Sequence, residues 1–468
     1  MPTRPPAPTD SLARCRRLVL AALVLLAFAG FRHHLFWGQS YGLLHVLSGL
    51  EAACLGAFAV LAACGWWRGM AVAERQPLPL RSLLALSLPI LLLAIVVPPF
   101  LTTDPVDYVV RGRVMALHGG NPYVQVATDY PDDPFLAFGD HAWKSFPLPY
   151  GPVVANLQAG IAWLAHLLPL PPRGELIAAL VLCKLLFGAA LVASAWAFAR
   201  VAERLRAGSG ARAFVAVLWN PLLLCECLAN AHNESLVLVC LAVATMALLG
   251  ERLLLAAVAL GLGVMTKVVP VLLLPLWSTF ALRRWRLLPF AAGLGIAALV
   301  GCAFVWQFGD LAGAVAVLGR QSELRGASVW WAVHEATGCG VERLVTVGRA
   351  GVVAWIVWSM WRLWRQPTLE NVVFGAASSL LMLAVFGAPL FGAWYHAWWI
   401  PFALLLERGF LFRCACMASI LSPLAWFTWA ATRRHDDVSQ WNIVLLAVVV
   451  PVALAALGWP RAPVAPRA

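Results

Sequence analysis

Most of this chain consists of apolar runs separated by short polar stretches, and the runs recur along nearly its whole length. About 20 apolar residues in a helix cross the roughly 30 Å of hydrocarbon in a bilayer. A segment in lipid must be helical, because no water is present to satisfy its backbone polar groups. The pattern therefore predicts an all-α, multispanning membrane protein with about 12 to 14 transmembrane helices. We expect these helices at residues 18–31, 43–66, 82–101, 175–199, 213–228, 235–250, 253–266, 268–282, 287–308, 350–364, 371–390, 397–407, 412–431 and 442–459.

Composition agrees with this prediction. Of the 468 residues, 62% are hydrophobic and 12% are charged, and the mean hydropathy is +0.81. These values exclude a soluble globular protein. The formal net charge of +12 is attributed to arginines that set the membrane orientation, so no nucleic-acid partner is expected. The eleven cysteines have neither metal-binding nor disulfide spacing, so they predict no metal site.

The expected organisation is a single polytopic membrane domain over residues 18–459. Residues 1–17 form a cytoplasmic N-terminal arm, and residues 460–468 form a cytoplasmic tail. Two large polar loops are expected on the outer side of the membrane. The first, 102–174, contains amphipathic helices and candidate chemistry, and the second covers 309–349.

The segment 151–168 is apolar but ambiguous, because it could either cross the membrane or lie along its outer surface. If it lies on the surface and the N-terminus is inside, most Lys and Arg residues fall in cytoplasmic segments. The positive-inside rule therefore favours a surface helix. In that topology the polar stretches 231–234 and 394–396, together with Lys267, lie on the same side as the loop 102–174.

The loop 102–174 opens with an unusual concentration of charge. Asp104 and Asp107 occupy the positions of a helix N-cap and of the third residue of a helix over 105–118, so capping alone would explain Asp104. Capping does not explain the cations in the same loop. A carboxylate beside fixed cations suits a reaction that deprotonates a hydroxyl and stabilises a phosphate leaving group. These cations are Arg111, Arg113, His118 and Lys144.

The order of several short motifs resembles that of GT-C glycosyltransferases, which are multispanning membrane enzymes that take a sugar from a polyprenyl-phosphate carrier. The resemblance covers roughly residues 80–400 and is closest to the bacterial polyprenyl-phosphate-mannose-dependent mannosyltransferases. The motifs are Asp104-x-x-x-Tyr108, Gly120-Asn121-Pro122-Tyr123, Pro149-Tyr150-Gly151-Pro152, Trp219-Asn220-Pro221-Leu222 with Glu226, Asn230-Ala231-His232-Asn233-Glu234, Thr266-Lys267 and Trp394-Tyr395-His396.

The resemblance implies an inverting hexosyltransferase in which Asp104 is the catalytic base. The implied donor is a polyprenyl-phosphate hexose, most readily mannose, and the implied acceptor is a glycan or a lipid-linked glycan. The implied location is the bacterial inner membrane, with the active site on the outer, periplasmic face. Asp107 and Glu234 are supporting carboxylates, although the family often has Asp where this chain has Glu234.

The departing polyprenyl phosphate needs positive charge, and the candidates are Lys267, Arg111, Arg113 and Lys144. For Lys267, anion binding stands beside plain snorkelling to the membrane surface. Helix capping is the alternative for His232, Asn233 and Glu234, and an interfacial aromatic belt is the alternative for Tyr395 and His396. The candidate substrate-binding residues are Tyr108, Asn121, Tyr123, Tyr150, Asn220, His232, Asn233, Tyr395 and His396.

Two other functions fit many spans and outward cations: a transporter or flippase of lipid-linked oligosaccharide, and a polysaccharide polymerase or ligase. A transport path would place polar residues at mid-membrane in several helices. The deep charges here are few, chiefly Glu51 and Lys184. A divalent metal shared by Asp104 and Glu234 is left open as a cofactor, because sequence spacing does not reveal their separation in space.

Overall fold

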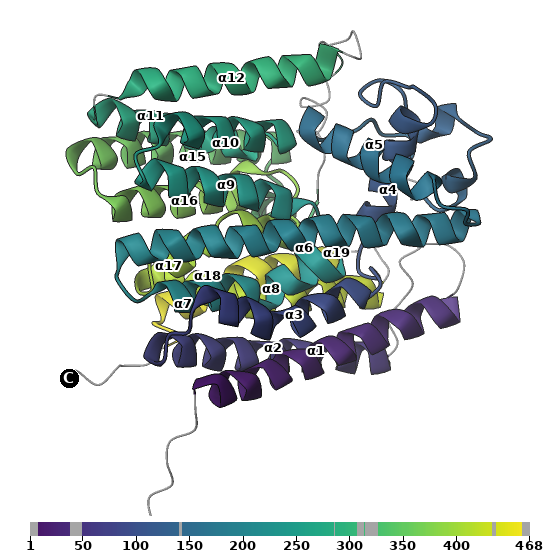
Figure 1. Cartoon of the computed structure of the whole chain (residues 1–468), viewed down its shortest axis with the longest axis horizontal. Coiled ribbons are helices and arrows are strands. Elements are labelled where there is room, and N and C mark those ends of the chain that lie inside the picture. Colours follow the sequence, from purple (N-terminus) through teal and green to yellow (C-terminus); the bar gives the residue numbers. More distant parts are fainter. Residues whose placement is uncertain are drawn as a thin grey trace, which may run out of the picture.

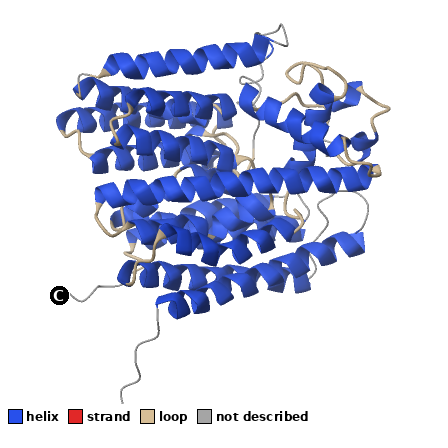
Figure 2. Ribbon diagram, viewed as in Figure 1, coloured by secondary structure: helices blue, strands red, loops and turns tan. Residues whose placement is uncertain are grey.

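The computed structural model describes residues 8–37, 49–139, 143–284, 286–306, 313, 326–432 and 437–460. Apart from one isolated bridge between Gly326 and Leu390, all regular structure in these residues is helical (Figure 2). The predicted all-α class is confirmed. Arg320, Glu323 and Arg325, which belong to the expected second loop, lie outside the described residues.

The N-terminal half contains the helices that surround the polar loop, and the C-terminal half completes the bundle (Figure 1). The first set is α1 (Pro8–Trp37), α2 (Gly49–Arg75), α3 (Leu80–Val96), α4 (Asp104–Ala116), η1 (Ala127–Asp129), η2 (Pro134–Ala137), α5 (Pro152–His166), α6 (Pro172–Leu205), α7 (Gly210–Leu218), α8 (Pro221–Leu223), η3 (Leu224–Ala229) and α9 (Glu234–Leu249). The second set is α10 (Leu253–Thr266), η4 (Val269–Leu273), α11 (Leu274–Arg283), α12 (Leu287–Trp306), α14 (Val329–Thr337), α15 (Val341–Arg365), α16 (Leu369–Met382), η5 (Leu383–Gly387), η6 (Ala393–Trp398), α17 (Ile400–Leu405), α18 (Gly409–Thr432), α19 (Asp437–Val444), η7 (Leu445–Val449) and α20 (Val450–Ala456).

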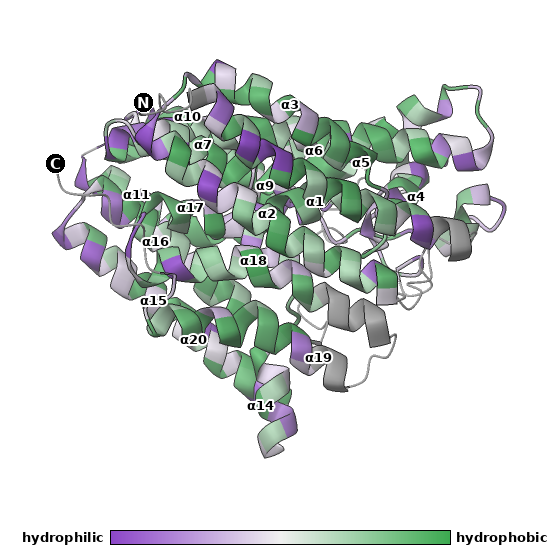
Figure 3. Ribbon diagram, turned by 90° about the horizontal axis from the view of Figure 1, so that it is seen from below, coloured by the Kyte–Doolittle hydropathy of each residue, from purple (hydrophilic) through white to green (hydrophobic). Residues whose placement is uncertain are grey.

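Among the described residues, five helices are long and apolar enough to cross a membrane: α2, α6, α12, α15 and the continuous pair α16–η5. A sixth candidate is the pair formed by α7 with α8 and η3, which bends by 42°. Six shorter apolar helices of 10–17 residues accompany them. The protein is thus a multispanning membrane protein, and hydrophobic residues dominate its helices (Figure 3).

Several expected helix bounds differ from the structure, and two of the differences change the assignment of a segment. Helix α1 begins at Pro8, so part of the expected N-terminal arm is helical rather than a separate segment before residue 18. The expected span 397–407 is the six-residue helix α17, which at 1.5 Å per residue is too short to cross a bilayer.

Helices α4 and α5 lie side by side at one end of the bundle, next to the first residues of α6 (Figure 1). Gly112 permits their close contact, because a Cβ atom there would overlap the backbone of Gln158 in α5. Gly151 permits a second close contact, where its N–H donates to the carbonyl of Thr266 at 3.1 Å. This contact brings Tyr150 and the start of α5 to the end of α10, beside Lys267.

Candidate active site

The carboxylate of Asp104 points away from its own helix. Asp104 is the first residue of α4, whose N-cap is Thr103, and the Asp104 N–H bonds to the Thr102 hydroxyl at 3.2 Å. Oδ2 of Asp104 lies 3.4 Å from Nδ1 of His232. Asp104 is therefore the first helical residue and not the N-cap, so the capping alternative does not hold, and its carboxylate contacts a distant segment.

His232 lies between two carboxylates. Its Nε2 atom is 3.3 Å from Oε2 of Glu226, which is fully buried in the π-helical turn η3. The ring stacks on Trp394, with centroids 4.3 Å apart and planes inclined by 21°. The His232 side chain is 1% exposed and that of Asp104 is 20% exposed. Asp104 is therefore the member of this row that a substrate can reach.

The row Asp104–His232–Glu226 fixes charge at the site. Burial alone would raise the pKa of the Asp104 carboxyl, but the contact with His232 and the charges of Arg111 and Lys267 hold that pKa below its ordinary value. Burial would also lower the pKa of His232, but Asp104 and Glu226 outweigh it and raise that pKa to about 10. At neutral pH an imidazolium thus lies between two carboxylates.

Lys267 and Glu234 form a second charged pair beside this row. Nζ of Lys267 is 2.6 Å from Oε1 of Glu234, and both side chains are at most one-tenth exposed. Three aromatic rings surround the ammonium group, with centroids 5.3–5.5 Å away, a distance typical of cation–π contacts. The rings belong to Tyr150, Tyr395 and Trp398. The structure thus brings the predicted residues Tyr150, Glu234, Lys267 and Tyr395 together.

Two further predicted residues adjoin this cluster. The ring of Tyr108 meets that of Tyr150 edge to face, with centroids 5.7 Å apart. Arg111 donates to the carbonyl of Trp143 at 3.3 Å, and its charge contributes to the low pKa of Asp104. Of the four cations expected near the donor phosphate, Arg111 and Lys267 act on the Asp104 carboxyl.

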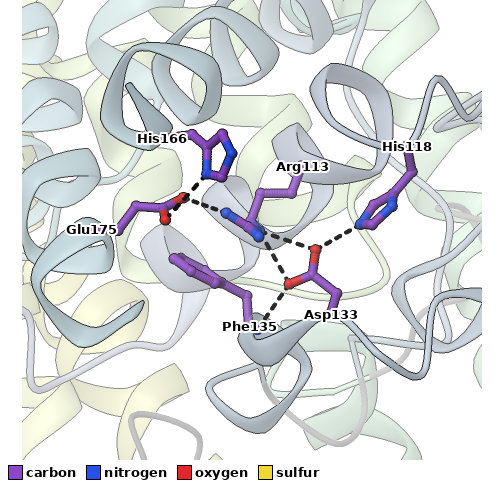
Figure 4. A network of polar contacts seen from close by, with 6 residues as sticks. All are labelled: Arg113, His118, Asp133, Phe135, His166 and Glu175. Carbon is purple, nitrogen blue, oxygen red and sulfur yellow. Dashed lines mark hydrogen bonds and ion pairs between the residues drawn. The ribbon is translucent and has the colours of Figure 1, made fainter. Parts of the chain in front are cut away.

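Arg113 is engaged elsewhere, in a network that ties the loop to α6 (Figure 4). Its guanidinium binds Asp133 at 3.0 Å and also pairs with Glu175 in the first turn of α6. It lies 3.9 Å from the ring centroid of Phe135. Figure 4 also shows His118 on Asp133 and His166 on Glu175. Because two carboxylates hold this cation, we assign Arg113 to the architecture of the loop.

Other predicted residues of the loop also have structural contacts. Nζ of Lys144 donates to the carbonyl of Leu136 at 3.0 Å. The carboxylate of Asp107 lies against Gly139, and Asp107 is buried. Oδ1 of Asn121 accepts the Tyr123 N–H at 3.0 Å, which shapes the turn after α4. Tyr123 packs in a small apolar cluster with Leu148 and Ala155.

Asn220 and His396, which were expected to bind substrate, are also satisfied within the protein. Oδ1 of Asn220 accepts the N–H groups of Leu222 and Leu223, and its amide donates to Ser419 at 2.9 Å. Asn220 therefore caps α8 at the bend of the broken span. Both ring nitrogens of His396 are engaged, one with the carbonyl of Ala447 at 2.8 Å and one with the indole N–H of Trp399 at 2.9 Å.

Asn233 differs from these residues. It is 1% exposed, yet neither atom of its side-chain amide has a hydrogen-bond partner among the described residues. Buried amides are normally satisfied, so this amide points to a missing partner. Its position between His232 and Glu234 keeps it a candidate for binding substrate hydroxyls.

Sequence reasoning did not assign a role to Glu226 or to Trp394. Glu226 is a carboxylate inside an otherwise apolar run, and that signal alone marks a residue with a specific partner. Only the fold shows that the partner is His232. Within the described ranges, no group of three or more His, Cys, Asp or Glu side chains is arranged to hold a metal ion.

Comparison with known proteins shows which family the chain belongs to. A family model described as "Alpha-(1→6)-mannopyranosyltransferase, N-terminal domain" matches residues 18–283, more than half of the chain. Alpha-(1→6)-mannopyranosyltransferase A of Corynebacterium glutamicum is 24% identical over 195 residues, which are 42% of this chain and 37% of that protein. A probable alpha-(1→6)-mannopyranosyltransferase of Mycolicibacterium smegmatis is 28% identical over 294 residues, 56% of this chain and 47% of that protein. The matches thus span less than half the length of these relatives, and they confirm the resemblance that the motif order indicated.

Proposed function

The chain belongs to the alpha-(1→6)-mannopyranosyltransferase family. We propose that it transfers mannose from a polyprenyl-phosphate donor to an acceptor hydroxyl. The acceptor is a glycan or a lipid-linked glycan. The observation that carries the proposal is the placement of Asp104, a partly exposed carboxylate that contacts a buried imidazolium and lies beside a second buried ion pair.

In the proposed reaction Asp104 is the general base. Its Oδ2 atom faces His232, so we assign to Oδ1 the proton of the acceptor hydroxyl. The acceptor oxygen forms a bond to the anomeric carbon while the bond from that carbon to the phosphate oxygen breaks, with inversion. The low pKa of Asp104 keeps the base ionised at neutral pH.

The departing polyprenyl phosphate takes the bonding electron pair and needs positive charge but no proton. Lys267 and Arg111 are the cations that we propose for this task, because both influence the Asp104 carboxyl. Glu234 neutralises Lys267 before the donor binds, and the phosphate competes with it for the ammonium group. Lys267 lies among aromatic rings, which strengthens its attraction for an anion by limiting access of water.

We place this site on the outer face of a bacterial inner membrane. Helix α6 runs along the bundle from the end that holds α5 to the opposite end (Figure 1). Arg200 and Arg204 belong to the last turns of α6, and Arg206 directly follows it. By the positive-inside rule this basic end lies in the cytoplasm, so Asp104 lies outside.

The test is transfer of labelled mannose from polyprenyl-phosphate mannose by the purified protein in detergent, wild type beside Asp104→Asn. We expect the variant to lose about 10²- to 10⁴-fold in kcat while keeping its thermal midpoint. Asp129→Asn, an exposed change in the same loop, is the matched control. Equal transfer by wild type and Asp104→Asn would show that the base lies elsewhere.

Two further arms complete the experiment. Transfer in EDTA is expected to persist, because His232 and Lys267 already neutralise Asp104 and Glu234, and abolition by EDTA with recovery in Mg²⁺ would show that a metal is needed. If no polyprenyl-phosphate sugar is turned over by the folded wild type, the transferase proposal fails, and flipping of lipid-linked oligosaccharide becomes the assay to run.

A further inference from the structure

Lys184 is a buried lysine that the proposed reaction does not use. It lies within the membrane-spanning helix α6 and is 2% exposed. Its ammonium group donates to two main-chain carbonyls, those of Val97 and Ala229, the latter at 2.8 Å. No carboxylate pairs with it in the described part of the chain. A charge at this position is costly in a membrane protein and therefore calls for a specific task.

The two carbonyls belong to the ends of two helices. Val97 is the C-cap of α3, and Ala229 is the last residue of the π-helical turn η3. Carbonyls at helix C-termini lack partners within the helix and carry the negative end of its dipole. The amino group of Lys184 donates to one carbonyl of each helix end and so satisfies both ends at once. Helices α3, α6 and η3 pack against one another around it.

Both helix ends lead directly into the candidate active site. The chain runs from Val97 through Pro98 and Pro99 to Asp104, and from Ala229 to His232. The second path contains a strained residue, Ala231, whose φ of +54° lies in the left-handed region. The turn is held by N–H bonds of 2.8 Å from Asn230 to Cys225 and from His232 to Glu226. These bonds set the shape of the turn but do not tie it to the segment that carries Asp104.

We infer that Lys184 is a positioning residue that fixes the two active-site segments relative to each other. By binding the carbonyls of Val97 and Ala229, it sets the relative positions of the two segments that carry Asp104 and His232. An apolar residue would fill the same space but would leave two carbonyls unpaired, and the Asp104–His232 contact would lose the anchor at the base of both segments. This inference rests on the proposed role of Asp104 as the base.

The test uses the full-length protein in detergent with Lys184→Met, which keeps an unbranched side chain but removes the charge and the donors. Ser194→Ala is the matched control, because Ser194 is buried in the same helix and donates to the carbonyl of Ala190 at 2.7 Å. Two quantities are measured: kcat and KM for mannose transfer, and hydrogen–deuterium exchange of the amides in residues 97–104 and 229–234.

Lys184→Met is expected to raise exchange in both segments together. It should lower kcat by about 10²-fold, as expected for a misplaced reacting group, and change the KM for the donor by less than about 3-fold. Ser194→Ala should resemble wild type in both measurements. If Lys184→Met does not fold, Lys184→Gln is measured instead; its shorter side chain keeps an amide N–H₂ group, so it should show the same changes in exchange and kcat, but smaller ones.

Unchanged exchange, a rise in only one segment, or a kcat loss that Ser194→Ala reproduces would each overturn the inference. A loss confined to thermal stability, with kcat unchanged, would also overturn it. If wild type transfers no mannose, the proposed function fails separately, and the exchange data still decide whether Lys184 ties the two segments together.

Discussion

Nδ1 of His232 lies 3.4 Å from Oδ2 of Asp104, and the same ring reaches Glu226 through its other nitrogen at 3.3 Å. These three residues come from α4, from the turn before α9 and from η3. The contact places a positively charged ring beside Asp104, a property that a general base acting on an acceptor hydroxyl can use. It also makes the site sensitive to the protonation of His232.

Stability should fall as the pH rises from 6.5 to about 10. The pKa of His232 is raised from 6.5 to about 10 in the folded state. Its ion pairs therefore contribute fully to stability below pH 6.5, and this contribution is lost as the pH rises to about 10. The thermal midpoint in detergent should therefore decline across this window in wild type. His232→Asn should be less stable at pH 6.5 and should show a flatter curve. Parallel curves for the two proteins would contradict a raised pKa.

Glu226→Gln should shift the alkaline limit of transfer to lower pH. The variant removes one of the two carboxylates that hold the proton on His232, and loss of an opposite charge at this range lowers a pKa by about 1–3 units. The measurement is kcat against pH between 6 and 10. Glu251→Gln is the matched control, since Glu251 pairs with Arg284 and Arg286 on an exposed surface. A profile shifted equally by both variants would show no special role for Glu226.

Variants of Lys267 and Glu234 should show that the effect of this ion pair on stability is distinct from the effect of Lys267 on donor binding. Lys267→Met leaves a buried carboxylate unpaired and should lower the free energy of unfolding by about 3–5 kcal/mol. Adding Glu234→Gln should restore most of this stability, because a buried pair that is replaced on both sides is often neutral. Kinetics of the double variant should still show a donor KM at least about 10-fold higher, corresponding to a lost charged contact. A wild-type donor KM would remove Lys267 from the phosphate site.

Arg113→Met should lower stability and leave the KM for the donor unchanged. Its loss leaves Asp133 and Glu175 without the cation between them, so the thermal midpoint should fall markedly. Arg113→Lys keeps the charge but not the forked geometry and should recover only part of the loss. For folded protein, the donor KM should match wild type. A raised donor KM would return Arg113 to the set of phosphate-binding cations.

The sequence alone predicted the structural class of this protein and the family that it resembles. Long apolar runs determine an all-helical membrane protein, because a bilayer admits few other backbone structures. The order of polar motifs between those runs indicated the mannosyltransferase resemblance that the family match confirms. Asp104 stood out in the sequence because a capping role left the neighbouring cations unexplained.

Only the tertiary structure decided which polar residue meets which. Arg111 and Arg113 are two positions apart on one helix, yet they point to different partners, because residues at this spacing lie on different faces. Asn220 and His396 are satisfied by Ser419 and by Ala447, which no motif relates to them. Lys184 looked like an isolated charge in an apolar run, and its partners are brought near by helix packing between distant segments. Sequence patterns report burial and local conformation, whereas such contacts depend on where each helix ends against its neighbours.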